Sequence, residues 1–250
     1  MVTQVRSISQ TGATEPFELQ IARGQIPGHS REHKFGSVPA MSTGQSGTIW
    51  DVNDTTYPWA SYTAAAVVNI ERNDAADEGL VVVVEGLDAD YNAISDTITI
   101  SGTDTLGTVQ FLRVNRAFVT SGQNTGNIDV EYGAAGGATI ARITAGQGQT
   151  LMAVYTVPAN KTLYLTQIAS SCEEGAESTV DLFTRFFGQD SFRIQHILEV
   201  AGGGHYRYPF NIPLRFPEKT DIDLRAAVRS NNARVTAVFD AILIDEEGPL

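Results

Sequence analysis

Most of the chain is predicted to form β-strands, because apolar and polar residues alternate in short runs that end at Gly, Asn or Asp. Phe17, Leu19 and Ile21 alternate with polar residues and predict a first strand. Residues 80–85 are rich in β-branched side chains, which is typical of a buried strand. Residues 94–100 alternate Ile with Thr, which predicts a strand with one solvent-exposed face. Short strands separated by turn residues favour a β-sandwich over an α/β fold.

The second half of the chain repeats this pattern after a glycine-rich stretch at 133–149. We therefore predict an all-β protein with two antiparallel β-sandwich domains and an extended N-terminal arm. The arm covers residues 1–16, the first β-sandwich domain covers 17–140, and the second, jelly-roll-like domain covers 141–250.

Residues 206–225 are the most informative run of the second domain. Pro209, Pro213 and Pro217 recur every four residues, which excludes a helix. Each proline also lacks the N–H that an interior strand donates, so the run is predicted to be a sheet edge or an inter-sheet connection. After Pro217 the aspartates of Asp-Ile-Asp-Leu-Arg225 alternate with apolar residues, which predicts a half-buried strand with the carboxylates on its polar face.

Aromatic and arginine side chains are concentrated in the same run. An interrupted edge strand cannot easily bury the combined apolar area of Tyr206, Tyr208 and Phe216. Arg207 and Arg215 lie among these rings as partners for carboxylates. We predict that a neighbouring subunit, in a symmetric trimer, covers part of this edge. The alternative is that these rings fill the domain's own core.

A second group of candidate contact residues lies in a long stretch that shows no clear period, between Gly24 and Trp59. Long irregular connections are often contact surfaces, and Trp50, Tyr57 and Trp59, with Arg23 just before the stretch, suit a subunit contact. The alternative is that the aromatic residues cover the core of the first domain.

Charge and composition narrow the functional classes. The formal net charge of −12 argues against nucleic acid as a partner, because phosphate binding needs clustered Lys and Arg. No apolar run reaches the length of a bilayer span, and the first residues lack a secretory signal, so we expect a protein made in the host cytoplasm. With Cys172 as the one cysteine, neither an internal disulfide nor a thiolate metal site is expected.

No motif supports catalysis or a cofactor. His29 and His33 have the spacing of zinc ligands on a helix, but Pro27-Gly28 precedes them, and we expect loop histidines instead. Asp88, Asp90 and Asn92 imitate part of a calcium loop without its glycine and glutamate, so a turn in which these side chains bond their own backbone explains them better. No Gly-x-Ser-x-Gly elbow is present. We predict no enzyme activity, cofactor or metal.

Four runs carry a resemblance to a known family: residues 17–30, residues 84–100, Thr150-Leu-Met-Ala-Val-Tyr-Thr-Val-Pro-Ala-Asn-Lys-Thr-Leu-Tyr-Leu165, and Pro213-Leu-Arg-Phe-Pro-Glu-Lys-Thr-Asp-Ile222. They resemble virion structural proteins encoded by tailed phages of marine bacteria, such as cyanophages and pelagiphages. The resemblance implies a non-enzymatic particle component that is located in the virion.

The position within the particle has three alternatives. A capsid-surface decoration or cement protein that binds the major capsid protein is favoured by small sandwiches, an acidic surface and the N-terminal arm. A protein of the neck, tail or fibre is the alternative in the same class. A receptor-binding or carbohydrate-binding tail protein is the third, and it requires a cleft lined by aromatic residues and carboxylates.

Overall fold

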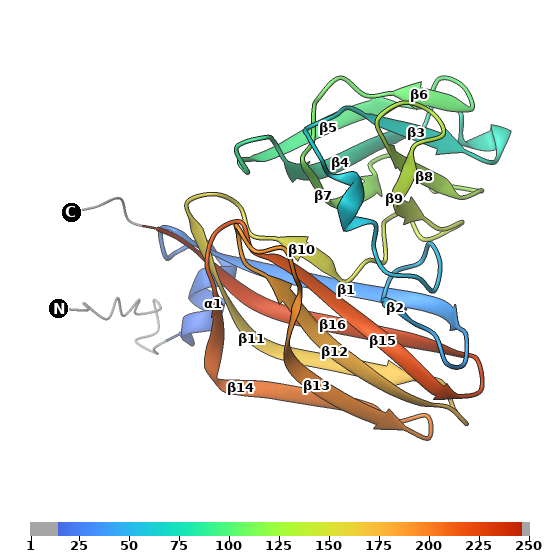
Figure 1. Cartoon of the computed structure of the whole chain (residues 1–250). Coiled ribbons are helices and arrows are strands. Elements are labelled where there is room, and N and C mark those ends of the chain that lie inside the picture. Colours follow the sequence, from blue (N-terminus) through green and yellow to red (C-terminus); the bar gives the residue numbers. More distant parts are fainter. Residues whose placement is uncertain (1–14, 247–250) are drawn as a thin grey trace.

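The computed structural model describes residues 15–246, which form antiparallel β-sheets (Figure 1). Strands take up 56% and helices 5% of the chain, which confirms the prediction of an all-β fold. No helix in this part of the chain is long and apolar enough to cross a membrane. Almost all of the predicted N-terminal arm, residues 1–14, lies outside the described residues.

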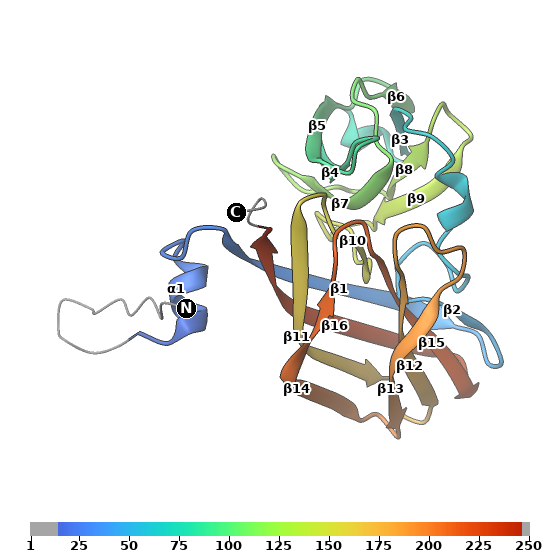
Figure 2. The ribbon, with the colours of Figure 1, turned by 60° about the vertical axis from the view of Figure 1, so that its left-hand side comes forward.

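The two larger sheets are built from both ends of the chain. One has the strand order β1-β16-β11-β14, and the other has the order β10-β15-β12-β13, with β2 also paired to β15. Figure 2 shows β11 and β14 in one layer and β13 and β15 in another. One hydrophobic cluster contains residues from both sheets. The strands are β1 (His29–Met41), β2 (Ser46–Thr48), β10 (Val154–Thr156), β11 (Lys161–Cys172), β12 (Glu177–Arg185), β13 (Arg193–Ala201), β14 (His205–Phe216), β15 (Asp221–Ser230) and β16 (Ala233–Asp245).

The two smaller sheets come from the middle of the chain and lie together above the larger ones in Figure 1. Their strand orders are β6-β3-β8-β9 and β5-β4-β7, and they share a second hydrophobic cluster. The elements are η1 (Trp59–Ser61), β3 (Val68–Arg72), η2 (Ala75–Asp77), β4 (Val81–Leu87), β5 (Ala93–Thr99), β6 (Asp104–Leu106), β7 (Arg113–Val119), β8 (Ile128–Tyr132) and β9 (Ala138–Ile143), where η marks a 3-10 helix.

The strand pairing divides the chain differently from the boundary predicted at residue 140. β1 pairs with β16 along its whole length, and β2 pairs with β15, so both strands lie in the sheets of the C-terminal segment. β3 to β9 are then an insertion between β2 and β10 of the larger sheets. Partners more than a hundred residues apart leave no local pattern, which is why the sequence did not predict this division.

The strand predicted at the start of the first domain is wrong, because these residues form helix α1 (Phe17–Ala22). The backbone N–H of Leu19 donates to the carbonyl oxygen of Pro16 at 3.1 Å, and both Gln20 and Ile21 are buried. Burial of two consecutive residues suits a helix and not a strand. Six residues are too few for an alternating pattern to distinguish the two structures.

β1 occupies a stretch that the sequence predicted to be irregular. The strand was not predicted because Gly36 and Pro39 interrupt its pattern. The structure shows why each of the two residues is tolerated there. A Cβ atom on Gly36 would lie 2.2 Å from the carbonyl oxygen of Ile49, so only glycine allows this close approach of two backbones. Pro39 lies where the register shifts between Val38 and Met41, a position that does not require its N–H.

β14 confirms the prediction of a sheet edge for the proline-rich run. It is the last strand of its sheet, with β11 as its one neighbour in the sheet order. Gln167 of β11 lies opposite Pro209, and the next paired residues are Leu165 and Leu214, so the segment that contains Pro213 leaves the ladder. The sheet tolerates these prolines because β14 is an edge strand with a neighbour on one side only, where proline is accepted.

Candidate functional site

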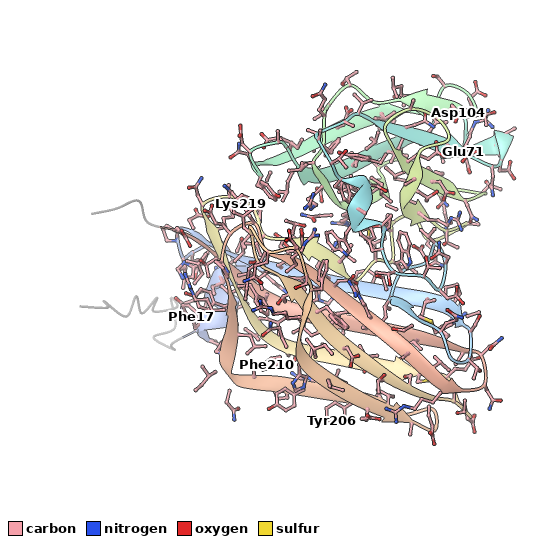
Figure 3. All side chains as sticks on the ribbon, viewed as in Figure 1. Phe17, Glu71, Asp104, Tyr206, Phe210 and Lys219 are labelled. Carbon is pink, nitrogen blue, oxygen red and sulfur yellow. The ribbon has the colours of Figure 1, made fainter. Side chains whose placement is uncertain are left out.

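An exposed apolar surface lies where β13 and β14, the edge strands of the two larger sheets, contact each other. Tyr206 is 44% exposed, Tyr208 is 38% exposed and Ile212 is 84% exposed. Figure 3 shows Tyr206 and Phe210 along this lower side of the molecule, on β14. We define the β13–β14 rim by its members His196, Tyr206, Tyr208, Phe210 and Ile212.

The register of β14 explains why its rings gather there. Tyr208 lies directly opposite Ile168 of β11, which is fully buried. Residues opposite each other in an antiparallel pair share a face, so the Tyr208 ring extends from the inner face of the sheet. Phe210 is on the same face and packs against the large hydrophobic cluster. Because β14 is the last strand, the rings extend past the edge of the core and remain partly exposed.

The rings of the rim pack on one another, but their polar atoms are not engaged. The ring centroids of His196 and Tyr208 are 4.5 Å apart, and those of Tyr208 and Phe210 are 5.0 Å apart. Burial lowers the pKa of His196, so its imidazole is neutral at pH 7. Among residues 15–246, neither Tyr206 nor Tyr208 has a hydrogen-bond partner for its hydroxyl. The rim is therefore an uncharged, ring-rich surface.

Two arginines flank the rim on β14. The Nε of Arg207 donates to Oε1 of Gln167 at 2.7 Å, across the outer face of the sheet. The Arg215 side chain is 59% exposed, and its nearest carboxylate oxygen, on Glu246, is 3.9 Å away. An exposed pair at this distance contributes little to stability, so both guanidinium groups keep N–H donors available to a partner.

The structure separates the residues that the sequence proposed as contact candidates. Tyr206, Arg207, Tyr208 and Arg215 lie together along β14, as described above, and are accessible. The remaining ones are placed elsewhere. Phe216 is buried in the larger core, Arg23 pairs with Glu15 beside α1, and the aromatic residues Trp50, Tyr57 and Trp59 are buried in the second cluster.

The buried aromatic residues belong to a polar junction between the larger and smaller sheets. Nε1 of Trp59 donates to Oδ2 of Asp223 at 2.9 Å, and Nε of Arg113 donates to Oδ1 of Asp221 at 2.9 Å. Tyr57 packs on Trp59 with ring centroids 4.8 Å apart. This arrangement corrects the prediction that the two aspartates form the wet face of a half-buried strand, because both are buried under the inserted segment.

The sequence contained one signal for this junction. Asp221 and Asp223 stand two apart and alternate with the apolar residues Ile222 and Leu224, and buried carboxylates require paired donors. Their partners come from far along the chain, since Arg113 is 108 residues from Asp221. The pairing itself could not be predicted.

A cleft of about 680 Å³ lies between β1 and the inserted strands β4, β5 and β7. Lys34 lines it, donates to the backbone carbonyl of Asn115 and is almost fully buried, and burial lowers its pKa to about 8. Burial also raises the pKa of Glu32 on the same strand. With a pKa of about 8, Lys34 is mostly protonated at pH 7.

The metal candidates take other roles. His29 and His33 lie on β1 and not in a loop, and Nδ1 of His33 is 2.7 Å from Oδ1 of Asp240. Oδ1 of Asp88 accepts the backbone N–H groups of Asp90 and Asn92, which is the turn that the sequence predicted. Across residues 15–246, no group of three or more His, Cys, Asp or Glu side chains is arranged to hold a metal ion.

Comparisons with known proteins add little to this geometry. No family model and no curated protein matches the chain. Among solved structures, the chain is similar to the structure of the infectious bursal disease virus Gx strain, with a TM-score of 0.28 and 11% identity. The match covers 88% of this chain and 73% of that chain, and a likeness this distant carries no argument about function.

Proposed function

We propose that this chain is a non-enzymatic structural protein of a virus particle, in which a second copy of the chain covers the β13–β14 rim. The observation that carries the proposal is the rim itself: exposed rings together with Ile212, in which the hydroxyl groups of Tyr206 and Tyr208 lack partners among residues 15–246. Two arginines that keep N–H donors available flank it. Contiguous exposed apolar surface on a folded protein marks an interaction site. Tyr and Arg are the residue types enriched where such contacts are strongest.

The strand order supports two sandwiches, the larger of them a jelly roll. Counted along the chain without the inserted strands and β10, the larger sheets have the orders 1-8-3-6 and 2-7-4-5. This interleaving of early and late strands is that of two Greek keys, and jelly rolls of eight strands are common in viral capsid and lectin domains. Four sheets would also suit a four-bladed ring. Two separate hydrophobic clusters, each shared by one pair of sheets, favour the sandwiches.

A second copy suits the rim better than continuation of the sheet. Pro209 and Pro213 remove two N–H donors from the open edge of β14, which opposes strand addition. Side-chain packing is the remaining mode of contact. Arg207 and Arg215 then meet a surface of a chain whose net charge is −12, so pairing with carboxylates of the neighbour is favourable. We propose a cyclic arrangement, with three copies as the preferred number.

Position and partner follow from the resemblance in the four sequence runs. We propose a decoration or cement protein on the capsid surface that binds the major capsid protein, assembles in the host cytoplasm and needs no cofactor or enzyme activity. A place in the neck, tail or fibre is the alternative. The acidic chain favours an outer surface away from packaged nucleic acid.

The test is the mass of the isolated full chain, measured by light scattering over a wide range of concentration. We expect an oligomer for the native chain and a monomer for the double variant Tyr208→Ser/Ile212→Ser. Leu106→Ser is the matched control, because Leu106 is exposed on the smaller sheets, and it should leave the mass unchanged. A native chain that stays monomeric at every concentration would contradict the proposed contact.

A further inference from the structure

We propose that a small cationic pocket at the junction of the larger and smaller sheets binds the carboxylate group of a ligand. The pocket holds about 130 Å³ and shares no residue with the β13–β14 rim. Figure 3 shows Lys219 at the end of the larger sheets that faces the inserted strands, opposite Tyr206 and Phe210. The residues that carry the argument are Tyr91, Arg113, Arg185, Phe187, Lys219 and Asp221.

The charge of the pocket is the reverse of the charge of the chain. Arg113, Arg185 and Lys219 line it together with one carboxylate, Asp221. Nε of Arg113 donates to one oxygen of Asp221 at 2.9 Å, and Nη2 of Arg185 donates to the other at 2.6 Å. Two of three positive charges therefore share a single negative one. A chain with 29 acidic and 17 basic residues concentrates an excess of positive charge at this point.

Lys219 is the cation without a carboxylate. Its Nζ lies 5.0 Å from the ring centroid of Phe187 and 5.7 Å from that of Tyr91, and no ion pair of Lys219 occurs within residues 15–246. Ring faces attract the ammonium group and hold it at the pocket. They do not neutralise it. The side chain is thus positioned and still able to pair with an incoming anion.

The backbone at the pocket is strained at two positions. Tyr91 has a φ of 67° and Lys219 has a φ of 60°, both in the left-handed region that side chains other than those of Asn and Asp rarely adopt. Such residues gather at ligand sites, where the surrounding structure maintains an unfavourable conformation. Here the two strained residues come from different loops, before β5 and before β15, and their side chains meet at the Lys219 ammonium.

A carboxylate suits the pocket better than a phosphate. Nη1 of Arg185 has no bond among the described residues, and a planar guanidinium edge matches a planar carboxylate. Asp221 lines the same space and repels a phosphate dianion more strongly than a carboxylate monoanion. The volume admits one small group, so the rest of the ligand lies outside, against the Phe187 ring, which is 63% exposed. We infer a carboxylate borne on a ring.

Calorimetric titration of the full chain at low salt tests the inference with two sources of a ring carboxylate, benzoate and galacturonate. We expect at least one to bind, with its neutral analogue, benzamide or galactose, weaker by about 10-fold or more. Lys219→Met should weaken binding by about 10-fold or more. Lys161→Met is the matched control, because Lys161 does not line the pocket and pairs with Asp245, and it should leave binding unchanged.

Three results would overturn the inference. If neither acid binds, or if the neutral analogues bind as tightly as the acids, the pocket is not a carboxylate site. Inorganic phosphate that binds as tightly as the better carboxylate contradicts the ligand class. An unchanged affinity in Lys219→Met removes the role of that residue. The mass of the protein in solution is a separate readout, so failure of this pocket is distinguishable from failure of the proposed subunit contact.

Discussion

The chain carries two groups of aromatic side chains that look alike in the sequence and have opposite positions in the structure. Trp50, Tyr57 and Trp59 are buried between the larger and smaller sheets, whereas Tyr206 and Tyr208 stay exposed on the β13–β14 rim. The polar atoms differ in the same way. Nε1 of Trp59 donates to a buried carboxylate, but the tyrosine hydroxyls of the rim lack partners among residues 15–246.

The difference shows that an aromatic group is buried or exposed according to whether another part of the chain packs over it, and not according to its composition. The first group is covered because seven inserted strands lie over the polar face of β15. The rim lies on the side of the larger sheets that no other part of residues 15–246 covers. A second chain is the cover that the rim lacks, and the variants below test this contrast.

Trp59→Ala has the largest expected effect. It removes a buried ring and leaves Asp223 with one donor fewer, so the free energy of unfolding should fall by about 3–5 kcal/mol. Urea unfolding measures the loss. Tyr206→Ala on the rim is the comparison, and in the dissociated monomer it should change stability by less than about 0.5 kcal/mol. Equal losses at the two positions would contradict the distinction between the two groups.

Arg113→Met tests the polar side of the buried junction. The variant leaves Asp221 buried with Arg185 as its remaining charged partner, and the free energy of unfolding should fall by about 3 kcal/mol. The control Arg116→Met alters an exposed arginine on the same strand, 4.0 Å from Glu85, and should change stability little. A small effect of Arg113→Met would mean that solvent reaches the junction.

Asp51→Asn should give a smaller effect that depends on pH. Burial raises the pKa of Asp51 from 3.8 to about 7, and one of its carboxylate oxygens has no hydrogen-bond partner in the described part of the chain. The folded chain keeps this proton up to about pH 7 while the unfolded chain loses it near pH 4, so stability falls as pH rises through that window. Asp51→Asn should therefore raise the free energy of unfolding at pH 8 by about 2 kcal/mol.

The same comparison made at pH 4 is the control for Asp51. There the folded chain holds the proton and the unfolded chain holds it nearly half of the time, so most of the gain from Asp51→Asn should vanish. A gain of equal size at both pH values would show that the asparagine acts through packing or hydrogen bonding instead of through removal of the charge. Melting temperatures of both proteins across this range provide the measurement.

The sequence predicts local features of this fold well and long-range ones poorly. The prolines of β14 identified a sheet edge, because a missing N–H is a property of one residue. β1 was missed, since the close approach that requires Gly36 involves Ile49 and Ala153 and cannot be seen locally. The candidate site follows the same rule. Tyr206 and Tyr208 were found from composition, but nothing near Trp59 in the sequence reveals that β15 lies beneath it.

The central claim is that a second copy covers the rim, and a thiol placed there tests it most directly. Cys172 is the one cysteine of the chain and is buried, so Ile212→Cys introduces a single accessible thiol, and Leu106→Cys provides a control on the smaller sheets. The measurement is the rate of maleimide labelling in dilute and in concentrated protein. We expect that labelling at position 212 slows as the oligomer forms, while labelling at position 106 does not. Equal rates at position 212 in both conditions would contradict it.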